Sequence, residues 1–294
     1  MRRLLIIGCG DVALRAIPQL KQRYRVFALS RNPANFARLR AMGVVPLQGD
    51  LDDRGSLARI AGLADAVLHL APPPNAGVSD TRTRNLLGAL SHAQGRIRRL
   101  PKRLVYISTS GVYGDCGGAC VSETHPTNAA TPRAIRRVDA ESQIRVWARR
   151  NHVNASILRV PGIYAQDRLP LGRLQQRTPG IVDSEDSYTN HIHADDLARI
   201  AGAALRRGQA CRAYHASDDS RLKMGEYFDS VADACGIPRV PRISRAEALS
   251  ALPESLLSFM NESRRLTNQR MKRELKVRLR YPTVADMLAT VMRH

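Results

Sequence analysis

The chain has 294 residues, 44% of them apolar, which is enough to bury a full hydrophobic core in one large domain or two joined lobes. Its 46 lysines and arginines outnumber 26 aspartates and glutamates, so the formal charge is +20 and anionic partners would be attracted. Five irregularly spaced cysteines argue against a secreted disulfide framework. The sequence has no stretch of eighteen apolar residues, and its N-terminus runs directly into a strand pattern instead of a signal peptide, so we expect a cytoplasmic protein.

Short apolar runs alternate with helical stretches through the first 160 residues. The expected strands cover residues 4–8, 25–30, 44–49, 66–71, 103–108 and 155–160, and the expected helices cover 11–22, 33–42, 54–61, 80–93 and 132–150. Strands that alternate with helices form parallel sheets with right-handed crossovers. The sequence therefore predicts an α/β fold, with a doubly wound parallel sheet of the Rossmann type in residues 1–160.

The second half of the chain has a looser pattern. A segment containing proline and glycine follows Arg159, and a helix near 194–208 and an apolar run at 213–217 come next. We expect residues 161–294 to form a smaller, interleaved C-terminal substrate lobe, with residues of about 188–218 completing the sheet domain.

The first strand runs into a G-x-G-x-x-A turn that opens a helix. Gly8 permits a tight turn, Gly10 lets the backbone approach a pyrophosphate, and Ala13 is small enough for the helix to pack on the strand. Backbone amides of residues such as Asp11 and Val12 would then bind the phosphates. The turn predicts dinucleotide binding, provided that the Asp11 carboxylate points away from the phosphates.

The ends of the next strands indicate which dinucleotide is bound. Ser30 and Arg31 stand where an NAD site would place an acid, and a hydroxyl with a guanidinium suits a ribose 2'-phosphate. The sequence therefore predicts NADP as the cofactor, with NAD as the alternative. The other interpretation is that Arg31 is a solvated loop residue without a role in cofactor binding. Asp50, followed by Leu51, could accept from an adenine amino group, and Ala71 ends a strand beside the cofactor path.

The sequence "LVYISTSGVYGD", residues 104–115, together with the glycine-rich turn, "GDL", "LHLA" and "HIHADDLA", resembles the extended short-chain dehydrogenase/reductases, the NAD-dependent epimerase/dehydratase family. Two later segments, residues 213–238 and 268–283, are most similar to the atypical YeeZ-like branch of this family, a group of nucleoside-diphosphate-sugar epimerases. The resemblance covers essentially the whole chain and implies a seven-stranded Rossmann sheet with a C-terminal substrate lobe. It also implies a Ser or Thr after the fifth strand and a Tyr-x-x-x-Lys pair on the next helix.

The catalytic pair of that family is missing. Thr109 stands at the Ser/Thr position, whereas Arg133 and Arg137 stand where the Tyr and Lys would be, when the helix is aligned by Glu141. Arginine stays protonated, so Arg133 cannot exchange a proton as a phenol does. Both arginines could clamp an anionic substrate or the cofactor ribose. Alternatively, both lie on the solvent side and pair with Asp139 or Glu141, which would stabilise the helix by about 0.3–0.5 kcal/mol.

Other groups could supply a proton. Tyr164, Tyr188, His191 and His193 lie in segments expected to face the substrate cleft, although a structural role is favoured for each. Tyr113 is expected to pack in its turn, and Asp195 to cap or precede a helix. Dehydratases of the family place an acidic pair after the Thr, and Ser110 and Gly111 stand there instead.

Three functions remain open. The first is an atypical NAD(P)-binding oxidoreductase or epimerase-like enzyme acting on a small anionic substrate such as a nucleotide sugar; the second is a non-catalytic NADP-binding sensor or scaffold. The third is a nucleic-acid-associated protein, although the basic stretches 95–103 and 264–280 lack interleaved aromatic residues and are better explained as solvated faces. The cysteine spacing indicates free thiols and no metal site, and the resemblance is compatible with a homodimer.

Overall fold

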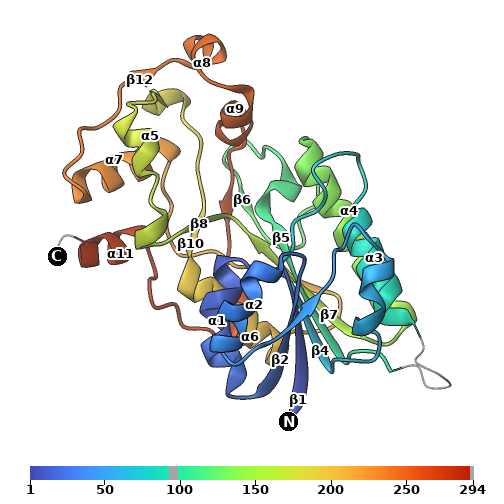
Figure 1. Ribbon diagram of the computed structural model, residues 1–294. Coiled ribbons are helices and arrows are strands. Elements are labelled where there is room, and N and C mark those ends of the chain that lie inside the picture. Colours follow the sequence, from blue (N-terminus) through green and yellow to red (C-terminus); the bar gives the residue numbers. More distant parts are fainter. Residues whose placement is uncertain (93–98, 292–294) are drawn as a thin grey trace.

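The computed structural model describes residues 1–92 and 99–291, and a seven-stranded parallel sheet forms the centre of this part of the chain (Figure 1). In spatial order its strands are β11 (Arg212–His215), β7 (Asn154–Val160), β5 (Arg103–Thr109), β4 (Ala66–His69), β1 (Arg2–Ile7), β2 (Tyr24–Ser30) and β3 (Val45–Gln48). The chain moves outward from β1 to β3 and then returns to the other side of β1. This topology confirms the predicted doubly wound fold, and ligands bind such sheets outside the carboxyl ends of the strands at the reversal point.

The central strand β1 shows why the sheet is buried on both faces. Leu4 and Ile6 pack into one hydrophobic cluster, and Leu5 and Ile7 pack into the other. Successive strand residues point to opposite faces, so a parallel strand covered on both sides has a continuous apolar sequence.

Two layers of helices cover the sheet (Figure 1). The face that carries Leu4 is covered by α1 (Asp11–Lys21), α2 (Phe36–Ala41), α6 (Ala194–Arg207) and α10 (Gln269–Leu275). The opposite face is covered by α3 (Thr81–Ser91) and α4 (Pro132–Arg150). In α1 the buried residues Ala13, Ala16, Ile17 and Leu20 follow the spacing of an amphipathic helix.

Most predicted elements agree with the structure, and α4 has the predicted bounds. The predicted helix at 54–61 is instead a 3₁₀ helix, η2 (Gly55–Ile60), and the predicted helix at 33–42 begins as another one, η1 (Pro33–Asn35). The last residue of the predicted helix 80–93 and the start of the basic stretch 95–103 lie outside the described residues.

The second lobe is built from short elements. Its helices are α5 (Leu171–Gln175), α7 (Met224–Ala234), α8 (Arg245–Ala251), α9 (Glu254–Met260) and α11 (Val284–Val291). Its strand pairs are β8 (Gly162–Tyr164) with β10 (His191–His193), β9 (Gly180–Ile181) with β12 (Arg242–Ile243), and β6 (Cys120–Val121) with β13 (Arg265–Leu266). The remaining 3₁₀ turns are η3 (Ser110–Tyr113), η4 (Gln166–Arg168) and η5 (Asp183–Glu185). Because β6 pairs with β13, a segment from the first 160 residues is joined to one near the end of the chain. The lobe boundary at residue 160 stays a prediction.

In the described ranges, no helix combines the length and the apolar character that crossing a lipid bilayer would require.

Candidate functional site

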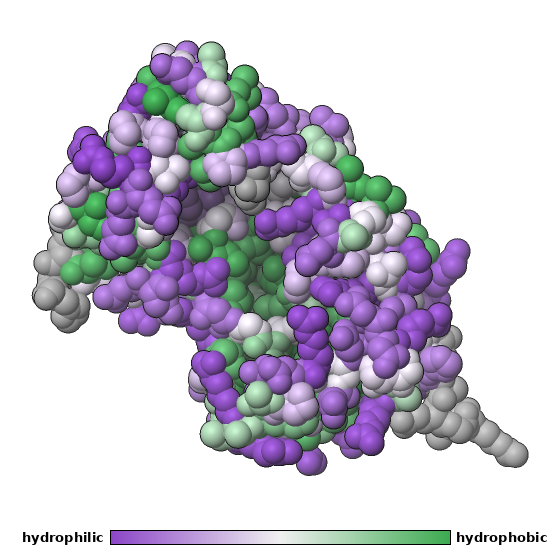
Figure 2. All heavy atoms as spheres, turned by 45° about the horizontal axis from the view of Figure 1, so that its top comes forward, coloured by the Kyte–Doolittle hydropathy of each residue, from purple (hydrophilic) through white to green (hydrophobic). Residues whose placement is uncertain are grey.

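A cleft of about 1100 Å³ lies between the carboxyl ends of the strands and the second lobe. Figure 2 shows the surface hollowed between these two parts. The end of β5, the start of α4, the β8 and β10 segments, and α7 and α9 all contribute to its wall. The described lining includes five arginines against the two acids Glu254 and Glu262; the arginines are Arg133, Arg136, Arg168, Arg173 and Arg264. A cleft with this lining suits a ligand that carries negative charge.

The glycine-rich turn has an open approach. Gly8 has φ of +88°, and a Cβ atom added there would lie 2.5 Å from the backbone nitrogen of Ala71. A Cβ on Gly10 would meet nothing within 4 Å, and Gly10 N-caps α1 without a side-chain hydrogen bond. The first amides of α1 are therefore accessible, as phosphate binding at a helix N-terminus requires. Ala13 is buried and Val12 is half-buried.

The predicted selector residues lie at the carboxyl end of β2. Arg31 is exposed, and the Ser30 hydroxyl donates to the backbone oxygen of Asn32 at 3.1 Å. After β3, Asp50 Oδ1 accepts from the backbone of Asp52 at 3.0 Å, and Leu51 is buried. The cofactor roles given to these residues and to Ala71, which is buried, stay predictions.

The arginines of α4 separate into two environments. Arg133 is exposed and lines the cleft. Arg137 is buried, and its Nη1 donates to the Tyr106 hydroxyl at 2.9 Å and to the carbonyl oxygen of Ile107 at 2.8 Å. The alternative that both arginines lie on the solvent side is therefore wrong for Arg137. Arg136, which the sequence analysis did not select, lines the cleft and donates to Gly77 O at 2.7 Å.

Glu141, the residue used to align α4, does not pair with Arg137. It is buried and forms an ion pair of 2.7 Å with Arg159 of β7, and it accepts from the Ser108 hydroxyl at 2.7 Å. Arg159 also donates to the Tyr113 hydroxyl at 2.7 Å. This buried network joins α4 to the strand ends that form the floor of the site.

Thr109 is the last residue of β5 and lines the cleft. Its hydroxyl accepts from the backbone of Gly111 at 3.2 Å and caps the short turn that follows. The hydroxyl proton stays available for a bound ligand, since accepting this bond does not use it.

Three rings with proton-bearing groups line the cleft: Tyr188, His191 and Tyr227. His191 and Tyr227 stack with ring centroids 4.1 Å apart. Burial lowers the pKa of His191 to about 3, so its imidazole is neutral at ordinary pH. Sequence analysis missed Tyr227, because its position in an amphipathic helix indicated only core packing.

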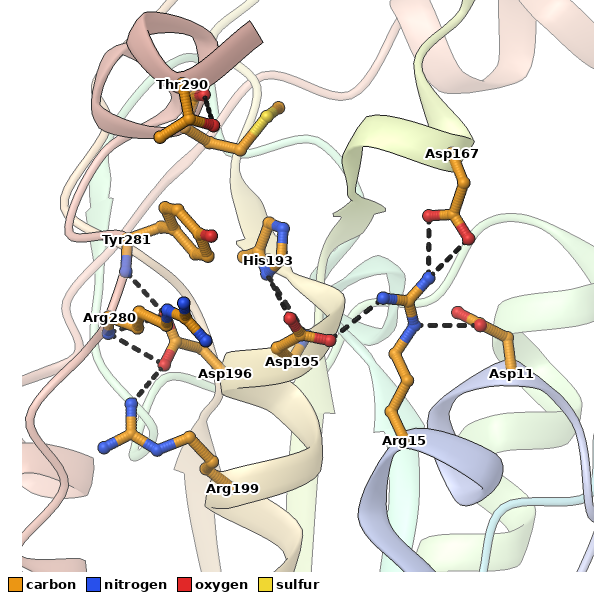
Figure 3. Close-up of polar contacts among 11 residues, drawn as sticks. Asp11, Arg15, Asp167, His193, Asp195, Asp196, Arg199, Arg280, Tyr281 and Thr290 are labelled. Atoms are coloured by element: carbon orange, nitrogen blue, oxygen red, sulfur yellow. Dashed lines mark hydrogen bonds and ion pairs between the residues drawn. The ribbon is translucent and has the colours of Figure 1, made fainter. Parts of the chain in front are cut away.

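The other predicted candidates lie elsewhere. Tyr164 is fully buried and is not among the described residues that line the cleft, and His193 lines a separate cavity of about 350 Å³. The expected capping by Asp195 was wrong: His193 caps α6, with its Nδ1 accepting from the backbone nitrogen of Asp195 at 3.2 Å. Asp196 is buried and accepts from the backbone nitrogens of Arg280 and Tyr281 (Figure 3).

Asp218 is a buried carboxyl behind His191. Its backbone nitrogen donates to the carbonyl oxygen of His191 at 2.7 Å, and its Oδ1 accepts from Ser220 N at 2.9 Å. Burial raises the pKa of Asp218 to about 7. Hydrogen bonds from Ser220 and from the Tyr164 hydroxyl favour the charged form but do not outweigh burial.

We expect the wild-type protein to lose stability relative to Asp218→Asn as the pH rises from about 4 to about 7. An unfolded aspartate releases its proton near pH 4, whereas folded Asp218 keeps it up to about pH 7. The folded state thus binds more protons in this window, and its stability falls as the pH rises. Urea unfolding of both proteins at several pH values measures the difference, and a constant difference across the window would contradict the assignment.

The basic stretch 264–280 is largely used inside the molecule. Arg264 donates to Gly114 O, Arg265 donates to Gly118 O, Arg270 donates to Ala213 O, and Lys272 pairs with Asp219. These contacts fasten the segment to the rest of the fold.

In residues 1–92 and 99–291, no group of three or more His, Cys, Asp or Glu side chains is placed to hold a metal ion. All five cysteines are free thiols.

Most of the sheet domain matches a described family. Residues 9–217 match the NAD dependent epimerase/dehydratase family. A dTDP-glucose 4,6-dehydratase from Mycobacterium tuberculosis is 26% identical over 189 residues, which cover 59% of this chain and 57% of that protein. The match thus spans little more than half the length of this curated relative.

Two solved structures resemble nearly the whole chain. A functionally unknown conserved protein from Silicibacter pomeroyi DSS has a TM-score of 0.79 and 26% identity, covering 100% of this chain and 99% of that chain. DesIV, a dTDP-glucose 4,6-dehydratase from Streptomyces venezuelae with NAD and TYD bound, has a TM-score of 0.77 and 24% identity, covering 99% and 96%. At the latter identity the match shows the fold alone.

Proposed function

The chain belongs to the NAD-dependent epimerase/dehydratase family, and from this premise we propose that it is an NAD(P)-dependent oxidoreductase or epimerase-like enzyme acting on an anionic nucleotide-sugar type of substrate. The observation that carries the proposal is the arginine-lined cleft that begins at Thr109, outside the carboxyl ends of the strands. Ligands bind open α/β sheets at this place.

The residues of the turn fit a dinucleotide. Gly10 leaves the backbone open, and the uncapped start of α1 offers amides to a diphosphate. Ser30 and Arg31 would meet the adenosine ribose, and Ala71 would border the nicotinamide side. The nicotinamide, when bound, supplies or accepts hydride; the chain holds it and excludes water.

The cleft arginines would hold the negative charge of the substrate. Burial lowers the pKa of Arg173 to about 10, so its guanidinium is partly desolvated but still charged. The Nε atoms of Arg136, Arg173 and Arg264 are buried and make no hydrogen bond in the described residues. Arg264 already pairs with Glu262 at 2.9 Å, so an anion in the cleft would chiefly offset the desolvated charges of Arg136 and Arg173.

Proton exchange with the substrate cannot involve Arg133, because a guanidinium keeps its proton. The Thr109 hydroxyl would orient a substrate oxygen, and the stacked His191 and Tyr227 are the proton-bearing pair on the opposite wall. Burial lowers the pKa of His191 and raises that of Tyr227, so both rings stay neutral at ordinary pH. We therefore propose that Tyr227 donates a hydrogen bond to the substrate, which orients it. Dehydration is not proposed, because Ser110 and Gly111 replace the acidic pair of the dehydratases.

Single-turnover assays test the enzymatic proposal. Purified protein with NADPH or NADP⁺ is mixed with dTDP-glucose or UDP-glucuronic acid, and cofactor absorbance and the sugar products are followed. Tyr227→Phe should slow turnover, whereas Tyr24→Phe, remote in sequence at the start of β2, should not. Cofactor binding without any absorbance change or rearranged sugar would contradict turnover of these substrates.

A non-catalytic NADP-binding sensor is the second candidate. It is favoured by the position of Arg137, whose guanidinium is bonded to Tyr106 and Ile107 instead of lining the cleft. A sensor would bind the dinucleotide and change conformation without consuming it.

For either function we propose a homodimer, and sedimentation of the purified protein measures this oligomeric state.

NADP⁺ is expected to bind more tightly than NAD⁺, and Arg31→Ala should remove the difference. Loss of one charge-assisted contact with the 2'-phosphate should weaken NADP⁺ binding about tenfold and leave NAD⁺ binding unchanged. Calorimetric titration measures both affinities. Arg25→Ala, an exposed arginine at the other end of β2, is the matched control. Equal affinity of the wild-type protein for both dinucleotides would contradict the selection.

A further inference from the structure

The N-terminal end of α1 is proposed to bind a diphosphate, and Asp11 places a carboxylate at this same end. It is the first residue of α1 and directly follows the open Gly10. The start of a helix carries partial positive charge and favours anions. An uncompensated carboxylate at this position would repel the second anion, so dinucleotide binding requires that its charge be neutralised.

Two arginines hold the Asp11 carboxylate from different parts of the chain. Arg15, one turn along α1, donates its Nε to Oδ1 at 2.8 Å, and Arg168 donates its Nη1 to Oδ2 at 2.9 Å. Partial burial alone would raise the pKa of Asp11, but the hydrogen bonds from Arg168 and Arg15 lower it. The carboxylate is therefore charged, directed toward the two guanidinium groups and compensated by them.

The two arginines differ in how firmly they are held. Arg15 also pairs with Asp167 at 2.6 Å and with Asp195 at 2.9 Å, so three carboxylates surround it (Figure 3). Its side chain is 22% exposed, whereas that of Arg168 is 37% exposed and lines the cleft. Arg15 thus anchors η4 to α1, and Arg168 extends from the anchored segment to the nucleotide turn.

We propose that Arg168 belongs to the dinucleotide site, where it neutralises Asp11 so that the start of α1 accepts a dinucleotide diphosphate. The inference depends on the proposed function, because it assumes that the turn binds a dinucleotide. It makes η4, which follows β8 in the second lobe, a part of the cofactor site. The ion pair between Arg168 and Asp11 then couples cofactor binding to the position of one wall of the substrate cleft, beside the anchoring pair of Arg15 with Asp167.

The competing interpretation is an ordinary surface ion pair. Both side chains are about one third exposed, at 37% and 35%, and pairs of this kind often contribute little to stability. Under that interpretation, removal of Arg168 changes neither the fold nor the affinity for nucleotides. The two interpretations differ in ligand affinity, which is the quantity to measure.

A double-mutant cycle on the full chain tests the proposal. Calorimetry with NAD⁺, NADP⁺ and ADP-ribose, each of which carries a diphosphate, is performed on wild type, Arg168→Gln, Asp11→Asn and the double variant. Arg168→Gln should raise each Kd about tenfold, and Asp11→Asn should bind at least as tightly as wild type. The double variant should return to within about threefold of wild type, because no carboxylate is left to neutralise.

Two further variants control for folding and charge. Arg168→Lys keeps the positive charge and should lose less affinity than Arg168→Gln. Arg239→Gln removes an exposed arginine that pairs with Asp233 in the second lobe, and it should leave every Kd unchanged. The effect of Arg168→Gln should also shrink when salt rises from about 0.05 to 0.5 M.

The possible failures are distinguishable. If wild type binds none of the three nucleotides, the proposed function fails and the inference fails with it. If wild type binds them and Arg168→Gln binds equally well, the function stands and the inference is overturned. A double variant as weak as Arg168→Gln also overturns it, because Arg168 would then act on the nucleotide without involving Asp11.

Discussion

Glu141→Ala should lower the free energy of unfolding by about 3 to 5 kcal/mol, because it leaves the buried Arg159 guanidinium without its counter-charge. Glu141 is 4% exposed and Arg159 is 5% exposed, and their charged atoms lie 2.7 Å apart. The substitution also removes the acceptor of the Ser108 hydroxyl. Urea unfolding at pH 7, followed by circular dichroism, measures the change.

A variant without either charge separates the ion pair from simple packing. Glu141→Leu combined with Arg159→Met should recover much of the lost stability, because no buried charge is then left unpaired. Asp233→Ala, which removes an exposed ion pair with Arg239, should leave the urea midpoint unchanged. If Glu141→Ala unfolded at the wild-type midpoint, the network around Arg159 would have no stabilising role.

The fold could be predicted because short, local sequence patterns determine its strands and helices. Continuous apolar runs such as Leu4–Ile7 are typical of strands buried on both faces, and their alternation with helices fixes a parallel sheet. The helix predicted at 54–61 was only partly correct. Leu57 and Ile60 are its buried residues, and a spacing of three fits the 3₁₀ period, which a short apolar pattern does not distinguish from an α-helix.

The charges of α4 were less predictable. The spacing placed Arg133, Arg137 and Glu141 on one face, but their environments depend on partners in distant strands. Tyr106 in β5 holds Arg137, and Arg159 in β7 holds Glu141. With 46 lysines and arginines in the chain, sequence alone offers no means to select which guanidinium is buried.

The residues of the far wall of the cleft also could not be predicted from sequence patterns. Tyr227 and Arg173 come from helices of the second lobe, and Arg264 comes from the segment before β13. Each segment has an unremarkable local pattern, and only tertiary packing brings the three side chains to one cleft. The turn at Gly8 was recognisable because its requirement is set by the backbone itself.

Gly8→Ala should destabilise the fold by about 3 kcal/mol and abolish dinucleotide binding. Gly8 has φ of +88°, which disfavours any residue with a Cβ atom, and the added atom would lie 2.5 Å from Ala71 N and 2.8 Å from Ala71 Cα. These contacts are with backbone, so β1 and the end of β4 would have to separate. Urea unfolding and calorimetry with NADP⁺ measure the two losses.

Gly10→Ala is the matched variant, because it separates binding from folding. Its Cβ would meet nothing within 4 Å, so the cost in stability should be below about 1 kcal/mol, the scale of a changed N-cap. The methyl group would nevertheless occupy the space through which a diphosphate approaches the start of α1, and NADP⁺ affinity should fall about tenfold or more. Wild-type affinity in Gly10→Ala would mean that the open space beside this glycine is not where the diphosphate binds.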